Sequence, residues 1–183
     1  MTPLPSATDA ADQLKTGLPV TFISTMDGDP WGGSEELWYE AALALRKQHV
    51  PVRAVVQKWP TPHPKVQALL NAGVDILFRT KKPTLVQKIE GRLNRRPVSH
   101  FVPMIETWMR KSPPGLIVLN EQFGLPSSEL TDMFRANGWR YIAVSHCNAE
   151  HWWPEDHDAE LHRQGVEAAE AMYFVSQGNL KLA

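Results

Sequence analysis

The chain has 183 residues, of which 43% are apolar and 21% charged, and its formal net charge at pH 7 is −1. This size and composition predict one globular domain and exclude an intrinsically disordered chain. The near balance of charge argues against binding of nucleic acid through bulk electrostatics, and the single cysteine, Cys147, excludes an intrachain disulfide.

Residues 1–17 are polar, contain two prolines and several small residues, and predict a flexible N-terminal extension. They lack the basic segment followed by an apolar segment that marks a secretory signal. No apolar run approaches the roughly 20 residues that a membrane-spanning helix needs. We therefore expect a cytoplasmic protein in which residues 18–183 form the domain.

The first β-rich apolar run, 19–25, predicts a strand that stops at the turn cluster DGDPWGG. A helix is expected next, with Ser34 as its N-cap, because a serine hydroxyl accepts a hydrogen bond from the first free amides of a helix. Glu35 and Glu36 place negative charge in the positive first turn. Apolar residues then recur at helical spacing up to an expected end near His49.

The same alternation of apolar strands and amphipathic helices continues to the end of the chain. Further strands are expected over 51–57, 74–79, 113–120, 139–145 and 172–176. Further helices are expected over 63–73, 83–95, 102–111, 127–138 and 157–171. Such an alternation predicts parallel βαβ units with right-handed crossovers. The expected fold class is α/β, a three-layer Rossmann-like domain with a mostly parallel sheet of about six strands.

Charge is distributed unevenly along the chain. Residues 79–96 carry seven basic side chains and one acidic one, whereas residues 150–170 carry seven acidic side chains and one arginine. Both stretches could be solvated helix faces that attract one another. Alternatively, the basic stretch 79–96 could bind anions or make a peripheral contact with anionic headgroups at a membrane surface.

Ligands of open parallel sheets bind beyond the carboxyl ends of the strands, at the switch point in strand order. The loop after the first expected strand, DGDPWGGSEE, should lie there. Gly32 and Gly33 allow a ligand to approach the backbone, and Ser34 begins a helix whose amides and dipole suit a phosphate. The loop matches neither the G-x-G-x-x-G nor the Walker pattern, so it could equally be a tight turn between a strand and a helix.

The loop after the fifth expected strand, SHCNAEHWWPEDH, is the second candidate. His146 follows the strand directly and could act catalytically, by positioning a sugar hydroxyl or easing its deprotonation. Asn148 and His151 add polar groups that could bind substrate. Trp152 and Trp153 are costly to expose, so they could stack on a sugar ring or pack against a neighbouring domain. In the structural alternative, backbone groups hold His146 and the tryptophans fill space under the last helix.

A zinc site could be assembled in this loop from His146, Cys147, His151 and His157. Their spacing matches no standard zinc motif. We therefore expect no metal, and no cofactor is predicted.

Two parts of the chain together resemble a known family: PWGGSEELW near the start, and NAEHWWP followed by YFVSQGNLKL near the end. They resemble the N-terminal half of group 1 glycosyltransferases, the retaining, nucleotide-sugar-dependent enzymes of the two-domain GT-B fold. The resemblance covers about residues 19–183. It implies a Rossmann-like half that mainly holds the acceptor and faces a C-terminal half that holds the nucleotide-sugar donor.

The resemblance also implies roles for particular residues. Gly32 and Gly33 would lie against the donor phosphates or the acceptor, and the loop from His146 to Trp153 would face the acceptor side of the cleft. Ser176 and Asn179 would lie near the crossover into the second domain. The leaving phosphate would be stabilised by electrostatic contacts without a metal.

The chain departs from this family by stopping at Ala183, where the crossover is expected. We therefore expect an acceptor-binding half whose donor-binding domain is absent and which is inactive alone. Glu121 and Glu129 have the Glu-x7-Glu spacing of the donor-binding half. This match is either a coincidence or a sign that the chain corresponds to the donor-binding half and not to the acceptor-binding half. The other candidates are a stand-alone Rossmann-like ligand-binding or interaction module without catalysis, and a nucleotide-dependent oxidoreductase, which the missing dinucleotide pattern disfavours.

Overall fold

The computed structural model describes residues 17–80, 101–149 and 154–182 of the chain. The strands are β1 (Val20–Ser24), β2 (Val52–Gln57), β3 (Asp75–Arg79), β4 (Leu116–Glu121), β5 (Tyr141–Ser145) and β6 (Ala171–Phe174). The helices are α2 (Gly33–Lys47), α3 (Pro64–Asn71), α5 (Val102–Arg110), α6 (Ser128–Ala136), α7 (Asp156–Ala168) and α8 (Gln177–Lys181). The expected helix over 83–95 and most of the expected extension over 1–17 lie outside the described residues.

The strands form one sheet in the order β3-β2-β1-β4-β5-β6, and every neighbouring pair is parallel. Val20, at the start of β1, is paired with Val52 on one side and with Leu116 on the other. The chain runs from β1 outward to β3 and then, on the other side of β1, outward from β4 to β6. The switch point therefore lies between β1 and β4, where sheets of this kind bind ligands. The predicted Rossmann-like α/β fold is confirmed.

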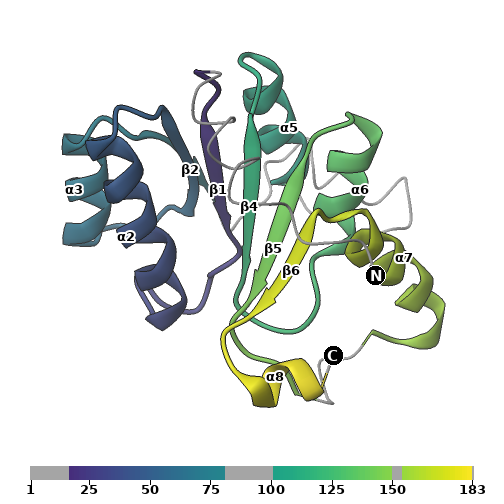
Figure 1. Cartoon of the computed structure of the whole chain (residues 1–183). Helices are drawn as coiled ribbons and strands as arrows, with labels where there is room; N and C mark the ends of the chain where they lie inside the picture. The colour runs from purple at the N-terminus through teal and green to yellow at the C-terminus, as the bar shows by residue number, and fades with distance from the viewer. Residues whose placement is uncertain (1–16, 81–100, 150–153, 183) are drawn as a thin grey trace.

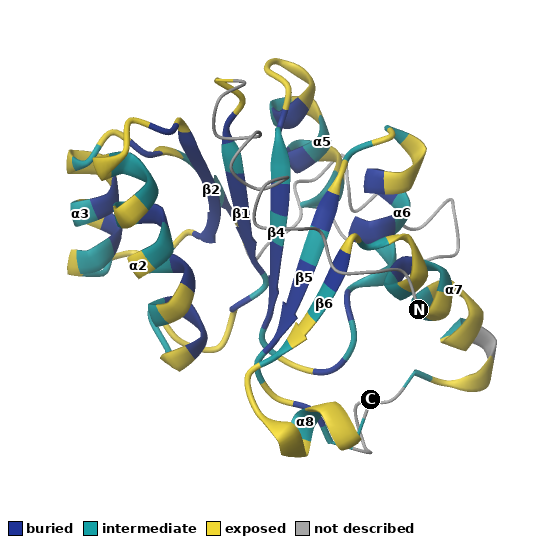
Figure 2. Ribbon diagram, viewed as in Figure 1, coloured by how far each residue is buried: buried dark blue, intermediate teal, exposed yellow. Residues whose placement is uncertain are grey.

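The two faces of the sheet are covered by different helices (Figure 1). Side chains alternate between the faces along each strand. Phe22 packs on one face with Trp38 of α2, whereas its neighbour Ile23 packs on the other face with Phe134 of α6. Figure 2 shows the strands β1, β2 and β4 largely buried between these layers. This packing fixes the strand ends, and so places the residues that follow them.

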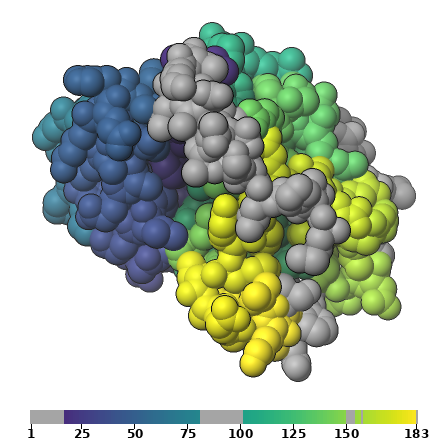
Figure 3. All heavy atoms as spheres, in the orientation of Figure 1, coloured from purple at the N-terminus to yellow at the C-terminus, as the bar shows by residue number. Residues whose placement is uncertain are grey.

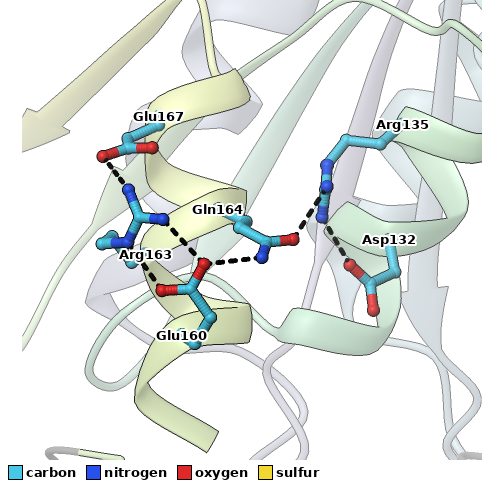
Figure 4. Close-up of polar contacts among 6 residues, drawn as sticks. All are labelled: Asp132, Arg135, Glu160, Arg163, Gln164 and Glu167. Carbon is cyan, nitrogen blue, oxygen red and sulfur yellow. Dashed lines mark hydrogen bonds and ion pairs between the residues drawn. The ribbon is translucent and has the colours of Figure 1, made fainter.

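Helix α7 lies against α6 and carries most of the acidic stretch. Glu160 and Glu167 both pair with Arg163 of the same helix, and Arg135 of α6 donates to Gln164 at 2.9 Å (Figure 4). The Arg163 guanidinium lowers the pKa of Glu160 to about 2. Two carboxylates of α7 therefore share one arginine of the same helix.

The structure corrects two boundaries that the sequence predicted. The N-cap of α2 is Gly32, and the Ser34 side chain makes no capping hydrogen bond. The last strand ends at Phe174, where its pairing with β5 stops, and α8 follows with Ser176 as its cap. Within the described residues, no helix is both long enough and apolar enough to cross a bilayer.

Candidate functional site

Polar side chains gather at the carboxyl ends of three adjacent strands. Ser24 ends β1 and is paired in register with Asn120 of β4. Ser145 ends β5, and His146 follows it directly. Because parallel strands end at the same edge of a sheet, these residues share the switch point between β1 and β4.

Glu35, in the first turn of α2, is the centre of a buried hydrogen-bond cluster. Its two carboxyl oxygens accept hydrogen bonds from the hydroxyls of Ser24 and Ser34. Trp38 Nε1 also donates to Glu35, at 3.4 Å. A carboxylate buried to 4% exposure needs such donors. The Ser34 hydroxyl therefore serves Glu35 and not the amides of the helix start.

Asn120 connects this cluster to His146. Asn120 Oδ1 lies 2.7 Å from His146 Nε2, and Asn120 Nδ2 donates to the carbonyl of Ser34 at 3.2 Å. Burial lowers the pKa of His146 below its ordinary value of 6.5, and the nearby Glu35 carboxylate opposes this effect. The imidazole is therefore neutral at pH 7, the state in which it accepts a proton.

The backbone of His146 is held from two directions. Its N–H donates to the carbonyl of Glu121 at 3.1 Å, and its own carbonyl accepts from Asn179 Nδ2 at 2.8 Å. The Ser176 hydroxyl accepts from the Asn179 N–H at 3.1 Å and so caps α8. Ser176, which was predicted to bind substrate, thus positions the side chain that holds His146.

Asn148 is a buried amide with spare hydrogen-bonding capacity. Asn148 is 5% exposed, and its Nδ2 lies 3.5 Å from the carbonyl of Asn179. Its Oδ1 has no hydrogen-bond partner within the described parts of the chain. A buried acceptor without a partner costs about 1–3 kcal/mol, and its presence in a native fold needs an explanation. A ligand hydroxyl is a suitable partner.

The loop between β1 and α2 is anchored by Trp31. Its Nε1 donates to Glu36 at 2.7 Å, and its ring stacks on His63 with centroids 5.0 Å apart. The edge of Tyr39 packs on it at 5.5 Å. These contacts tie the loop to α2 and to the start of α3, so its backbone is preorganised.

The two glycines of this loop have different surroundings. A Cβ atom on Gly32 would lie 2.5 Å from Cε of Met26, the flexible end of that side chain, which would have to shift to admit it. A Cβ atom on Gly33 would meet nothing within 4 Å. The backbone at Gly33 is therefore open at the start of α2.

Glu121 and Glu129, which match the Glu-x7-Glu spacing, have different roles. Glu121 is 4% exposed and accepts a hydrogen bond from the N–H of Ser127 at 2.7 Å, next to the start of α6. Burial raises the pKa of Glu121 to about 7, although hydrogen bonds from Ser127 and Thr25 oppose the rise. Glu129 lies in the first turn of α6. Glu121 thus supports the structure around the β4 end.

Arg79 was grouped with the basic stretch 79–96, and this assignment is wrong for Arg79. Its side chain is buried, donates to Gln57 Oε1 at 3.0 Å and to the Ser24 carbonyl at 3.2 Å, and also donates to the carbonyl of Met26. It fixes the chain that leaves β1 toward the glycine loop. Residues 81–96, and with them the predicted anion or membrane contact, lie outside the described residues.

An apolar groove of about 450 Å³ adjoins the polar cluster. It lies between α2 and one face of β1, β4 and β5, beside α2 (blue) in Figure 3. Leu37, Val118 and Ile142 line it, and Asn120 and Trp38 belong to both the groove and the cluster. The sequence did not predict this groove, because it depends on which strands α2 covers.

The structure brings together most of the predicted site residues. Asn120 and Asn179 connect Ser34, His146, Asn148 and Ser176, and Gly32 and Gly33 flank Ser34. His151, Trp152 and Trp153 lie outside the described residues. Among the side chains that are described, no group of three His, Cys, Asp or Glu could hold a metal ion. The zinc alternative also needs His151 and the side chain of His157, which are not among them.

Sequence reasoning missed Asn120, and it named Asn179 only as a residue near the crossover, whereas both residues hold His146. The signal for Asn120 was a polar residue ending the otherwise apolar run GLIVLN. Asn179 followed Ser176 by three residues, the spacing of a capped helix start. Both signals identify a strand end or a helix cap, and only the folded chain shows that they meet at one histidine.

Comparisons with known proteins show similarity in architecture. No protein-family model and no curated protein sequence matches the chain. The chain is similar to LpCGTa, a glycosyltransferase solved in complex with UDP, with 12% identity and a TM-score of 0.44 over 70% of this chain and 30% of that one. It is also similar to a mutant form of enoyl thioester reductase from Candida tropicalis, with 12% identity and a TM-score of 0.41 over 86% of this chain and 36% of that one.

The chain thus spans about a third of the length of these two structures. A likeness at this identity concerns the arrangement of strands and helices and assigns no activity.

Proposed function

We propose that this chain is the acceptor-binding half of a retaining glycosyltransferase, which moves a sugar from a nucleotide-sugar donor to an acceptor hydroxyl. The observation that carries the proposal is the His146–Asn120 pair at the switch point, beside the loop with Gly32 and Gly33. The sequence segments that resemble group 1 glycosyltransferases contain these two loops. A separate donor-binding domain would supply the other side of the cleft.

The surroundings of His146 suit work on a hydroxyl group. A neutral imidazole accepts a hydrogen bond or a proton from an alcohol, and positioned bases contribute about 10²–10⁴-fold to such reactions. Burial keeps His146 neutral at pH 7. We therefore assign His146 the role of the residue that orients the acceptor hydroxyl and eases its deprotonation.

Asn148 supplies a second group for carbohydrate recognition. Its buried Oδ1 needs a donor, and sugar hydroxyls are donors. A site built to hydrogen-bond a hydroxyl also rejects ligands that lack one, because its polar group would stay unpaired. Trp152 and Trp153 of the same loop would add the apolar wall on which a sugar ring stacks.

Glu35 favours the acceptor over the donor as the ligand at the start of α2. Phosphates bind helix starts through free amides and the helix dipole. Here the Glu35 carboxylate lies in that first turn and already accepts hydrogen bonds from the hydroxyls of Ser24 and Ser34. A phosphate next to a buried carboxylate would be repelled. A neutral sugar at Gly33 and Ser34 meets no such repulsion.

Saturation-transfer NMR on the full chain tests this proposal with three ligand sets: mono- and disaccharides, nucleotide sugars, and nicotinamide dinucleotides. We expect carbohydrates to receive saturation and the dinucleotides to receive none. His146→Ala and Asn148→Leu should each weaken carbohydrate binding at least tenfold, about 1.4 kcal/mol. Asn148→Leu should change stability by less than about 1 kcal/mol, because it removes an unpaired acceptor.

The matched control is Arg163→Ala, which removes two exposed ion pairs on α7. It should leave carbohydrate binding unchanged. If dinucleotides bind and carbohydrates do not, the oxidoreductase alternative replaces the proposal. If no member of the three sets binds, the chain is better described as an interaction module.

A further inference from the structure

The orientation of the Asn120 amide is set by a group that only accepts hydrogen bonds. The carbonyl oxygen of Ser34 lies 3.2 Å from one end of the amide, so that end must be the NH₂ group. The other end, Oδ1, therefore faces His146 Nε2 at 2.7 Å. Since Oδ1 is an acceptor only, His146 Nε2 must carry the proton.

We propose that Asn120 is a positioning residue that fixes neutral His146 as its Nε2–H tautomer and so makes Nδ1 the basic nitrogen of the site. In a neutral imidazole one nitrogen donates and the other accepts, and the hydrogen bond of the first sets the role of the second. No described residue makes a hydrogen bond to His146 Nδ1. The lone pair of Nδ1 is the one left for a ligand.

Asn120 is well suited to hold the ring in one orientation. It is 2% exposed, and its backbone carbonyl accepts from the N–H of Thr25 at 3.1 Å across the sheet. His146 is anchored independently through Glu121 and Asn179. His146 is thus held at its main chain, and its ring is held at Nε2. This leaves little freedom to exchange the roles of the two ring nitrogens.

The chemical consequence rests on the proposed function. The acceptor O–H bond breaks and its proton moves to Nδ1 of His146, while the oxygen forms a new bond to the anomeric carbon of the donor sugar on the same face that the phosphate leaves, as retention of configuration requires. The bond from that carbon to the donor phosphate breaks, and its electron pair leaves with the phosphate. Asn120 touches neither substrate. It acts by keeping the proton on the other nitrogen.

The test reads the tautomer directly from the ¹⁵N resonances of the His146 ring in the full chain without ligand. His146→Gln identifies the signals by their loss. We expect a protonated Nε2 and an unprotonated Nδ1 in the wild-type protein between pH 7 and 8. A protonated Nδ1, or averaged signals of both tautomers, would overturn the proposal.

Two variants of Asn120 separate positioning from simple support of the fold. Asn120→Asp keeps an acceptor at Nε2 and should keep the tautomer while raising the pKa of His146, because a carboxylate stabilises the imidazolium. Asn120→Leu removes the acceptor and should give averaged ring signals in a chain that remains folded. A Leu variant that folds and retains a pure Nε2–H ring would contradict the proposal. If the Leu variant does not fold, the Asp variant decides the question. An unchanged pKa of His146 in Asn120→Asp would then contradict the proposal.

The matched control is Asn148→Leu, which removes a neighbouring amide that does not contact the ring. It should leave the tautomer unchanged. These measurements need no ligand, so they stand apart from the proposed function. A chain with the expected tautomer that binds no carbohydrate would refute the transferase role alone, whereas a chain that binds carbohydrate with Nδ1 protonated would refute the role of Asn120 alone.

Discussion

Two buried carboxyl groups near the switch point are stabilised in different ways. Glu35 accepts hydrogen bonds from two hydroxyls and an indole N–H, donors that a buried carboxylate needs. Glu121 is also buried, and its burial outweighs the backbone and hydroxyl donors around it, so its pKa rises to about 7. At pH 6, below this raised pKa, the carboxyl group of Glu121 therefore holds a proton.

Glu121 makes the stability of the fold depend on pH. Its folded-state pKa of about 7 lies above its ordinary value of 4.5, so between these values the folded chain binds a proton that the unfolded chain has released. Stability from this group is therefore full below about pH 4.5 and falls as the pH rises to about 7, by at most about 3 kcal/mol. Glu121→Gln keeps an acceptor for Ser127 and removes the titration.

Urea unfolding of both proteins at intervals from pH 4.5 to 8 measures this effect. The difference in unfolding free energy between wild type and Glu121→Gln should move steadily in favour of the variant as the pH rises, and then level off above pH 7. Parallel pH dependences in the two proteins would show that Glu121 does not hold a proton in the folded state.

The individual site residues could be predicted from the sequence, but their partners could not. His146 follows an apolar run that ends in a polar loop, and this local pattern places it at a strand end. The contact between Asn120 and the His146 ring exists because β4 and β5 are neighbours in the sheet and Asn120 faces α2. Arg79 shows the same limit, since local charge put it with the lysines that follow and tertiary packing buries it beneath the β1 end.

The loop that begins α2 is the element through which the proposed ligand would approach. Its sequence predicted a helix start, and the helix is there, but the serine expected to cap it donates to Glu35 instead. Propensity favours serine at an N-cap, and here a buried carboxyl one residue later competes for the hydroxyl. The cap position itself is taken by Gly32, next to the end of the Met26 side chain.

Substitution of the two open glycines of this loop tests whether ligand reaches the backbone. Gly33→Ala adds a methyl group in open space at the first turn of a helix, so stability should change by less than about 1 kcal/mol. Carbohydrate affinity should fall at least tenfold, because the methyl group occupies the approach to the backbone. Thermal unfolding and equilibrium titration measure the two effects.

Gly28→Ala is the matched control, because a Cβ atom there also meets nothing within 4 Å but lies before the tryptophan that anchors the loop. It should preserve both stability and affinity. Equal affinity losses in the two variants would indicate a general effect of loop stiffness, and no loss in Gly33→Ala would place the ligand elsewhere.

The C-terminal boundary shows how pairing limits a strand that sequence alone extends. YFVS is rich in β-forming residues, which predicts a strand to Ser176. The partner strand β5 ends at Ser145, which is paired with Phe174, so the ladder stops there. The chain then turns into α8, and Asn179 of that helix holds His146. The local sequence of a strand does not reveal where the partner strand beside it ends.

At the scale of the whole molecule, the alternation of strands and helices was enough to predict the layers and the parallel sheet. The order β3-β2-β1-β4-β5-β6 was not predicted, because it depends on the chain crossing from β3 to the free side of β1. This crossing creates the switch point and places Ser24, Asn120 and His146 together. The candidate site at this edge of the sheet is therefore assembled by one long-range connection.

The most direct measurement of the central claim is a chemical-shift map of the ¹⁵N-labelled full chain titrated with the carbohydrate that binds best. The amides of Gly33, Ser34, His146 and Asn148 should shift together and saturate with one dissociation constant, while nucleotide sugars alone should bind no more tightly than about 1 mM, or about −4 kcal/mol. Saturable shifts confined to the groove around Val118 and Ile142 or to α7, with these four amides unmoved, would contradict a carbohydrate site at the switch point.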